Sequence, residues 1–282
     1  MSQISLYKIL SKIFFVTFIF LNLQNISSAY EQIQIDYPDK SANQPATSTY
    51  YFKGANSKAL IIYFAGGSGK IYRNCILPFT DPFIKLTEKN SSQDNYDFSC
   101  FHSDKILDTP GKWDNYHTMS YALRSEKEHI LRIESAINFY KSKTNLPIIL
   151  FGHSNGGVSV LTTLEHLIRE NKLNLISGII VAETNDRAAT KLKDLYINQK
   201  INLPYIFMLH EKTRCKSVNY NNQVSEFKSI IDAKRAAANI ITIQSGGDST
   251  NDPCYSGYHM FEGAGEEVFE KVQNQLNKIK FK

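Results

Sequence analysis

Apolar and polar positions follow two alternating patterns along this chain. Short, nearly continuous apolar runs are each followed by a longer segment whose apolar residues recur every three or four positions, as Ile130, Ile133 and Ile137 do. The first pattern is typical of buried strands and the second of amphipathic helices. Strands are predicted at residues 49–53, 59–64, 96–101, 147–151, 175–182, 205–209 and 240–244. Helices are predicted at residues 76–89, 126–141, 158–168, 188–197, 224–238 and 266–279.

The order of these elements predicts the fold class. Apolar strands that alternate with amphipathic helices favour an α/β protein with a mostly parallel central sheet and helices on both faces. No repeat or low-complexity linker interrupts residues 30–282, so we expect a single domain there. The polar stretch at residues 36–48 is predicted to be a surface loop.

The first residues carry the pattern of an export signal. Lys8 and Lys12 precede or border an apolar run at residues 13–23, and small residues follow at 27–29. This predicts a secretory signal peptide over residues 1–29. Since the apolar run is shorter than the ~20 residues of a membrane span, we favour cleavage over an uncleaved anchor. We therefore expect a secreted or periplasmic protein without a stable membrane anchor.

Charge and cysteine content indicate which partners and cross-links to expect. The formal net charge of +5 includes the two lysines of the leader. No Lys/Arg cluster interleaves with aromatic residues, so no nucleic-acid partner is expected. In an exported chain, an even number of cysteines suggests disulfides. Of the three pairings we favour Cys215–Cys254 and Cys75–Cys100, with free buried thiols as the alternative.

The segment Gly152-His153-Ser154-Asn155-Gly156 lies between a predicted strand and a predicted helix. Gly-x-Ser-x-Gly in this context places a serine hydroxyl on a sharp turn, where it is exposed as a nucleophile. The N–H of Asn155 then lies at a helix N-terminus, where it can stabilise an oxyanion. A serine that only caps the helix is the alternative reading.

Four segments together make the chain resemble the α/β-hydrolase superfamily over nearly all of residues 30–282. They are the turn AGGSG at 65–69, the segment GHSNG at 152–156, the strand end Leu209-His210, and CYSGYHMF at 254–261. The resemblance implies a nucleophile, an acid and a histidine base in that chain order.

The resemblance also implies roles for particular residues. Ser154 would be the nucleophile, and His259, just before the last helix, would be the base. The oxyanion hole would combine the N–H of Asn155 with that of Gly67, with Ser68 as the alternative second donor. This machinery needs no cofactor, and no metal-binding pattern is present in usable form.

The triad acid is the member that departs from the family pattern. It is expected after the strand at 205–209, where the chain reads HEKTRC without an aspartate. Glu211 is the predicted acid because it is the only carboxylate in that window. Glu183, at the end of the preceding strand, is the alternative, followed by Asp248 and Asp252. A disulfide between the cysteines at 215 and 254 would tie the acid loop to the loop of the base.

Two loops bear on the substrate. The gap between the strand at 175–182 and the strand at 205–209 has room for one helix, so no large lid is expected and a true lipase is disfavoured. The segment at 101–124 is predicted either as one wall of the substrate pocket or as an ordinary covering loop.

These patterns predict a secreted serine hydrolase that cleaves carboxylic esters of small molecules through an acyl-enzyme. Amides, peptides and thioesters remain open as acyl donors, because the same machinery serves all of them. The alternative is a catalytically degraded α/β-hydrolase that binds a ligand or a partner, which the missing aspartate would support.

Overall fold

The computed structural model describes residues 30–39, 46–67, 75, 95–102, 124–199, 201–233, 238–247, 253–254 and 257–280. The chain divides into two compact units, Met1–Tyr30 and Glu31–Lys282, and the fold below belongs to the second. The predicted leader at 1–29, the predicted helix at 76–89 and nearly all of the segment at 101–124 lie outside the described residues.

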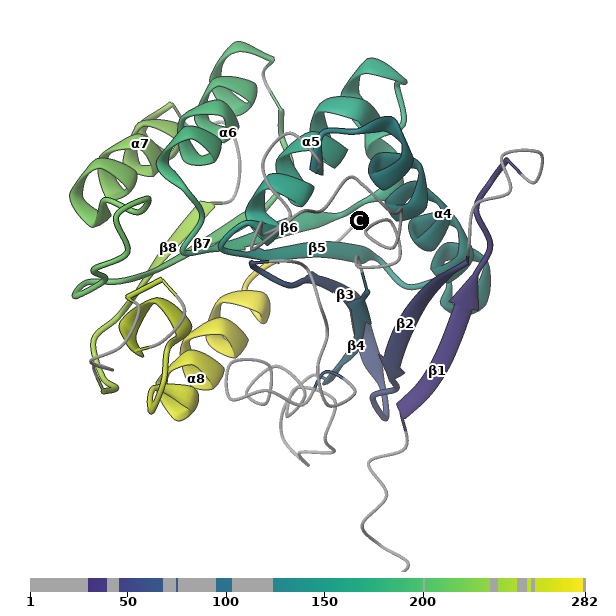
Figure 1. Cartoon of the computed structure of the whole chain (residues 1–282), viewed down its shortest axis with the longest axis horizontal. Coiled ribbons are helices and arrows are strands. Elements are labelled where there is room, and N and C mark those ends of the chain that lie inside the picture. The colour runs from purple at the N-terminus through teal and green to yellow at the C-terminus, as the bar shows by residue number, and fades with distance from the viewer. Residues whose placement is uncertain are drawn as a thin grey trace, which may run out of the picture. The chain divides into compact units, whose positions relative to one another are not determined.

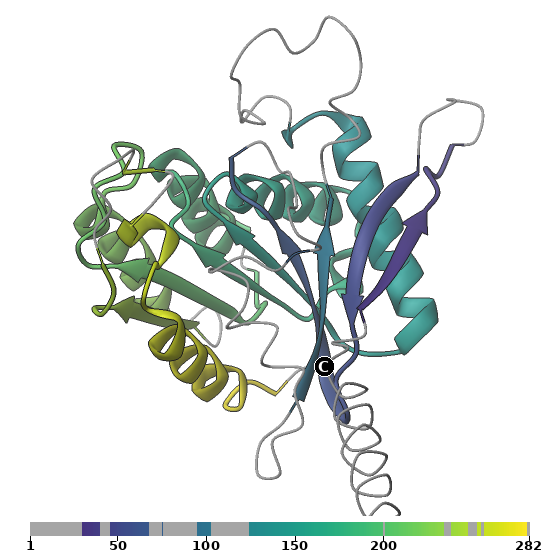
Figure 2. The same ribbon diagram turned by 60° about the horizontal axis from the view of Figure 1, so that its bottom comes forward.

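The described strands form one sheet of eight, in the order β1-β2-β4-β3-β5-β6-β7-β8 (Figure 1). In chain order they are β1 (Tyr30–Ile35), β2 (Thr47–Phe52), β3 (Ser57–Phe64), β4 (Asn95–Phe101), β5 (Ile148–His153), β6 (Gly178–Ala182), β7 (Tyr205–His210) and β8 (Ala238–Ile243). Six neighbouring strands of the sheet, β4-β3-β5-β6-β7-β8, are parallel to one another, and β2 runs antiparallel to β4. Figure 2 shows the twist that accumulates across this sheet. The predicted mostly parallel sheet is confirmed.

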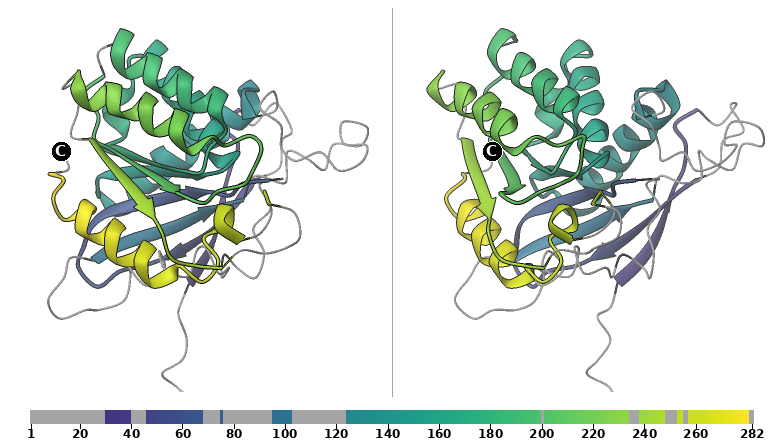
Figure 3. Two further views of the ribbon diagram at one scale, coloured as in Figure 1. Left: turned by 90° about the vertical axis from the view of Figure 1, so that its left-hand side faces the viewer. Right: turned by 60° about the vertical axis from the view of Figure 1, so that its left-hand side comes forward.

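Helices cover both faces of the sheet, as predicted. They are α4 (Lys127–Thr144), α5 (Gly156–Arg169), α6 (Asp186–Asn198), α7 (Tyr220–Asp232) and α8 (Gly265–Leu276), with short 3₁₀ helices η5 (Leu173–Leu175) and η6 (Gly257–Met260). Figures 1 and 3 show α5, α6 and α7 on one face, with α4 beside α5, and α8 on the opposite face. Every residue of β5 and β6 is buried, which explains why these strands are continuously apolar rather than alternating.

Several elements differ from the predictions, and three of the differences involve strands β1, β2 and β8. The alternating strand β1 was not predicted, and β2 begins at Thr47, inside the predicted loop at 36–48. The helix predicted to end at residue 238 ends at Asp232, and Ala238 already pairs with Tyr205 in the sheet. Alanine has high helix propensity, but at Ala238 pairing with β7 overrides it.

The cysteines form two disulfides, Cys75–Cys100 and Cys215–Cys254, which are the two predicted pairings. Across the ranges that the structure describes, none of the helices combines the length and apolar character needed to cross a membrane.

The strand register brings four loops to one edge of the sheet. Phe64 at the end of β3 pairs with Gly152 of β5, and His153 pairs with Ala182 at the end of β6. Ala182 in turn pairs with Met208 of β7. The chain segments that follow β3, β5, β6 and β7 therefore begin side by side at the carboxyl edge, where open α/β sheets bind ligands.

Candidate functional site

Ser154 lies on a tight turn between β5 and α5. Its backbone has a φ of 52°, in the left-handed region that residues other than glycine rarely adopt. The turn is closed by two backbone hydrogen bonds, from the Ser154 N–H to Ala182 O at 2.8 Å and from the Gly157 N–H to Ser154 O at 2.9 Å. At Gly156 a Cβ atom would collide with the carbonyl oxygen of Phe64, so only glycine lets α5 approach β3 this closely. The Gly-x-Ser-x-Gly segment thus folds into a strained strand–turn–helix corner, as its spacing predicts. We call residues 152–156 the serine corner.

Glu183 is the carboxylate that contacts His259. It follows β6 directly, is fully buried, and also has a positive φ of 47°. Its Oε2 lies 3.1 Å from His259 Nδ1 and accepts a hydrogen bond from Thr213 Oγ1 at 2.6 Å. Its Oε1 accepts one from the backbone N–H of His210 at 2.6 Å. Two donors, Thr213 Oγ1 and the His210 N–H, therefore hold this carboxylate in one orientation against the imidazole.

His259 lies in η6, between β8 and α8, and its side chain is buried. Because a carboxylate only accepts, Nδ1 carries the proton that faces Glu183, which leaves Nε2 as the basic nitrogen. Nε2 is buried and has no hydrogen-bond partner among the described residues. Ser154 Oγ does not bond to it in this structure; such contacts often tighten only when substrate is bound.

Glu211, the first choice for the acid, does not contact His259. Its backbone N–H donates to Ile243 O at 3.1 Å, so it continues the pairing of β7 with β8. Its Oε2 accepts from Gln244 Nε2 at 2.9 Å, beside the edge strand. The structure thus brings the alternative, Glu183, to His259 and does not bring Glu211 there, because the ladder carries residue 211 toward β8. Asp248 and Asp252 lie outside the described residues.

The turn after β3 touches the serine corner. A Cβ atom at Gly66 would come within 2.8 Å of the Cβ of Ser154, so the turn and the serine are in direct contact. The two predicted oxyanion donors, the N–H groups of Gly67 and Asn155, both belong to this contact region. In the part of the chain that the structure describes, neither N–H donates to an acceptor. Ser68, the alternative donor, lies outside that part.

Comparison with solved structures identifies the fold. The chain superposes on dienelactone hydrolase from Anabaena variabilis with a TM-score of 0.59 at 9% identity, over 89% of this chain and 97% of that one. It superposes on XC6422 from Xanthomonas campestris, described as a serine hydrolase without a lid, with a TM-score of 0.56 at 8% identity, over 90% and 96% of the two chains. It superposes on brefeldin A esterase with a TM-score of 0.54 at 11% identity, over 89% of this chain and 77% of that one. The chain has the α/β-hydrolase fold. No family model matches the sequence, and no curated protein sequence is significantly similar to it.

Within this α/β-hydrolase fold, His153 links the serine corner to the base. The sequence motif leaves this position variable, so its role was not predicted. Its Nε2–H donates to the backbone carbonyl of His259 at 2.9 Å, and the two rings lie 5.2 Å apart. Burial, followed by the neighbouring His259, lowers the pKa of His153 to about 3, so this ring is neutral near neutral pH.

The loop after β7, which was predicted to supply the acid, donates hydrogen bonds to Glu183. The His210 Nε2–H donates to Ser245 O at 2.8 Å, and the ring lies 4.5 Å from that of Tyr258. Thr213 donates to the acid itself, and the disulfide at Cys215 begins two residues later. That disulfide joins the loop of Thr213 to the segment that leads into His259, as the sequence suggested. The sequence shows that this loop is polar, but it does not show that His210 and Thr213 both donate to Glu183.

The buried neutral histidines predict a loss of stability in acid. Burial lowers the pKa of His153 to about 3 and that of His129 well below 6.5, whereas both rings titrate near 6.5 when unfolded. The unfolded chain thus binds more protons below pH 6.5. The stability from the two neutral rings is complete above that pH and is lost as the pH falls toward 3, by about 1.4 kcal/mol per pH unit for each ring.

Urea unfolding measured in steps between about pH 7 and pH 5, above the range in which carboxylates titrate, checks this prediction. His153→Gln keeps an N–H donor for His259 O but removes one titrating group, so it should reduce the slope by about half. An identical slope in the variant would contradict it.

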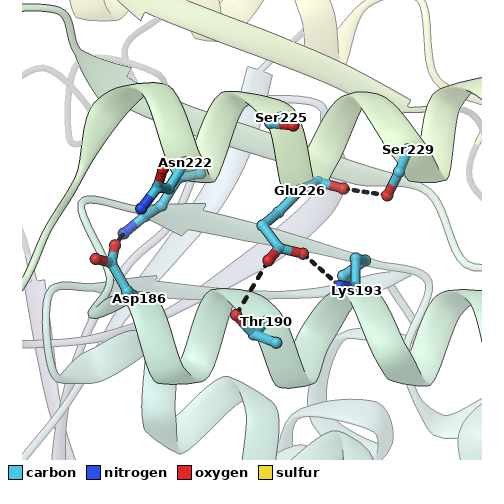
Figure 4. Close-up of a pocket in the computed structure, with 8 residues that line it drawn as sticks. Asp186, Thr190, Lys193, Asn222, Ser225, Glu226 and Ser229 are labelled. Atoms are coloured by element: carbon cyan, nitrogen blue, oxygen red, sulfur yellow. Dashed lines mark hydrogen bonds and ion pairs between the residues drawn. The ribbon is translucent and has the colours of Figure 1, made fainter.

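Two hollows formed by described residues are lined by residues away from the serine corner. One is a polar groove between α6 and α7, where Glu226 pairs with Lys193 at 2.6 Å and accepts from Thr190 at 3.3 Å (Figure 4). The other lies beside β8 and includes Glu211 and Lys271. The described residues contain no group of three or more histidine, cysteine or acidic side chains that could hold a metal ion.

Proposed function

We propose that this protein is a serine hydrolase that cleaves carboxylic esters through an acyl-enzyme, with Ser154 as nucleophile, His259 as base and Glu183 as the acid that orients the base. The observation that carries the proposal is the buried contact between Glu183 Oε2 and His259 Nδ1, at 3.1 Å, beside a serine with a positive φ. A hydroxyl, a carboxylate and an imidazole are the groups that acyl transfer by a triad requires, and here they follow one another along the chain in the order of α/β-hydrolases.

The mechanism follows from the protonation of His259. Ser154 Oγ adds to the ester carbonyl carbon while its proton passes to His259 Nε2. The C–O bond to the alcohol then breaks, and the alcohol leaves with that proton, so the acyl group stays on Ser154. Water, deprotonated by the same nitrogen, then attacks the acyl carbon. The carboxylic acid product departs, and Ser154 regains its proton from His259. Glu183 stays ionised and stabilises the imidazolium that forms in each half of the cycle.

The oxyanion of each tetrahedral intermediate needs donors that have no other partner. The Gly67 and Asn155 N–H groups meet this condition among the described residues, and Gly66 touches Ser154. Ser154 also precedes the first residue of α5, so the positive end of the helix dipole faces the site. Each such donor typically contributes about 10²–10³ in rate.

The segment between β6 and β7 supports a small ester as substrate. It contains α6, which packs along α5 and α7 rather than forming a separate covering domain. XC6422, one of the structures of the same fold, is described as a hydrolase without a lid. We therefore propose short acyl esters over lipid aggregates, and a series of esters of increasing acyl length tests this choice.

Export is part of the same proposal. Both disulfides are of the kind that persists in an oxidising compartment, and the leader pattern at residues 1–29 supports a route there. The degraded, ligand-binding alternative depended on the missing acid; the position of Glu183 removes that support.

A fluorophosphonate probe tests the proposed chemistry without knowledge of the natural substrate. Ser154 Oγ should attack phosphorus, expel fluoride and pass its proton to His259, which leaves a stable covalent label. The wild-type protein should be labelled and Ser154→Ala should not. The exposed Ser217 offers a matched control, since Ser217→Ala should label like the wild type. Absence of label on folded wild-type protein would overturn the proposal.

A further inference from the structure

Arg124 is a fully buried arginine whose guanidinium lies under the serine corner. It is distant in sequence from the residues it binds and was assigned no role from the sequence. Its Nη2 donates to the carbonyl oxygens of Ala65 at 2.9 Å and Gly67 at 3.2 Å. Its Nη1 donates to Ser159 Oγ at 2.6 Å. One side chain therefore binds both the turn after β3 and the helix that follows the nucleophile.

These contacts bracket the site of the oxyanion. Ala65 and Gly67 flank Gly66, which touches the Cβ of Ser154, and Ser159 lies on α5 just after the serine corner. A peptide unit is planar, and its N–H points away from its C=O. Holding the carbonyls of residues 65 and 67 therefore sets the two peptide planes on either side of the Gly66–Gly67 peptide, whose N–H is the proposed second oxyanion donor.

The guanidinium suits this task in shape and in charge. Its planar fork presents several N–H donors in a rigid arrangement, which a lysine ammonium does not reproduce. Burial lowers the pKa of Arg124 to about 9, which still leaves it charged near neutral pH. The backbone carbonyl of Arg124 accepts from Thr162 Oγ1 at 2.8 Å, so the residue is itself anchored to α5.

We propose that Arg124 is a positioning residue for the oxyanion hole: it holds the turn at residues 65–67 against α5, so that the Gly67 N–H faces the carbonyl oxygen of the substrate. The inference rests on the proposed function. It adds a residue outside the triad whose loss weakens binding of the transition state more than binding of the ester.

A second buried arginine provides a matched control. Arg132, on α4, is 2% exposed, donates to Thr47 Oγ1 at 3.0 Å and lies over the ring of Tyr37. Thr47 belongs to β2 and Tyr37 to the segment before it, so neither contact involves the turn at residues 65–67. Arg132→Met thus measures the general cost of removing a buried guanidinium, and Arg124→Met measures that cost together with any effect on the oxyanion hole.

The experiment compares kcat and KM for p-nitrophenyl acetate in the wild type, Arg124→Met, Arg124→Lys and Arg132→Met, with urea unfolding to establish that each variant is folded. Arg124→Met should lower kcat by about 10–10²-fold, less than loss of a direct oxyanion donor, while KM changes by less than about 3-fold. Arg124→Lys should recover part of kcat, and Arg132→Met should leave it near the wild-type value. Methyl trifluoromethyl ketone forms an adduct with Ser154 that carries the oxyanion, and the affinity for this ketone should fall in parallel with kcat.

Several results would overturn the inference. A folded Arg124→Met with wild-type kcat would do so, as would an equal loss in Arg132→Met or a loss confined to KM. If Arg124→Met does not fold, Arg124→Lys decides: a lowered kcat at unchanged KM supports the role, and a wild-type kcat contradicts it. A wild-type protein that neither hydrolyses the ester nor reacts with a fluorophosphonate would overturn the proposed function and this inference together, whereas an active wild type with an unaffected Arg124→Met would overturn only the inference.

Discussion

Glu183→Gln should lower kcat by about 10⁴-fold while the protein stays folded, because the loss of the triad acid has an effect of this size in serine hydrolases of known mechanism. The substitution keeps the shape of a side chain whose two oxygens accept from His210, Thr213 and His259. With a carboxamide at this site, its NH₂ group can face Nδ1, which moves the proton of His259 to Nε2. The imidazole then presents a donor to Ser154 where catalysis needs an acceptor.

Glu211→Gln is the matched control for this prediction. It makes the same chemical change in the residue that the sequence pattern favours, but Glu211 bonds to Gln244 and not to His259. Its kcat with p-nitrophenyl acetate should equal that of the wild type. Full activity in Glu183→Gln, or a larger loss in Glu211→Gln, would return the acid to the loop after β7.

Ser154→Ala should have the largest effect, a fall in kcat of about 10⁶-fold, with residual hydrolysis supported by the oxyanion hole and by substrate binding. Because the triad acts as a unit, its losses are not additive. Adding Glu183→Gln to Ser154→Ala should therefore cost little further activity, although Glu183→Gln alone is severely impaired. Steady-state rates of the two single variants and the double variant, at matched enzyme purity, measure this coupling.

The outcome that contradicts it is equally definite. If the double variant loses another factor of about 10⁴ beyond Ser154→Ala, Glu183 acts independently of Ser154. Its buried contact with His259 would then serve the fold or some other process rather than nucleophile activation.

The contact between Glu183, the proposed acid, and His259 has a simple geometric reason. Ser154 follows β5 and Glu183 follows β6, and the strands pair so that His153 lies opposite Ala182. The backbone joins them directly, through the hydrogen bond from Ser154 N–H to Ala182 O at 2.8 Å. A glutamate at the end of β6 thus reaches the histidine that an acid after β7 would otherwise serve. The chain order of nucleophile, acid and base is unchanged.

The loop after β7 keeps a supporting role. His210 and Thr213 hold the two oxygens of Glu183, and the disulfide Cys215–Cys254 joins this loop to the segment that leads into His259. The acid and the base are therefore supported by a covalently connected pair of loops.

The sequence by itself determined the alternation of strands and helices and the serine corner, through the local signals of apolar periodicity and glycine spacing. It also placed a histidine before the last helix, and among the three cysteine pairings it favoured the two that the structure contains. It did not determine where the helix–strand boundary near residue 238 falls, because pairing with β7 outweighs local helix propensity there. The contact of Glu183 with His259 and that of Arg124 with the turn after β3 were decided only by the tertiary structure. Glu183 and Arg124 act through partners far away in sequence, and only the register of the sheet and the packing of α5 bring those partners within hydrogen-bond distance.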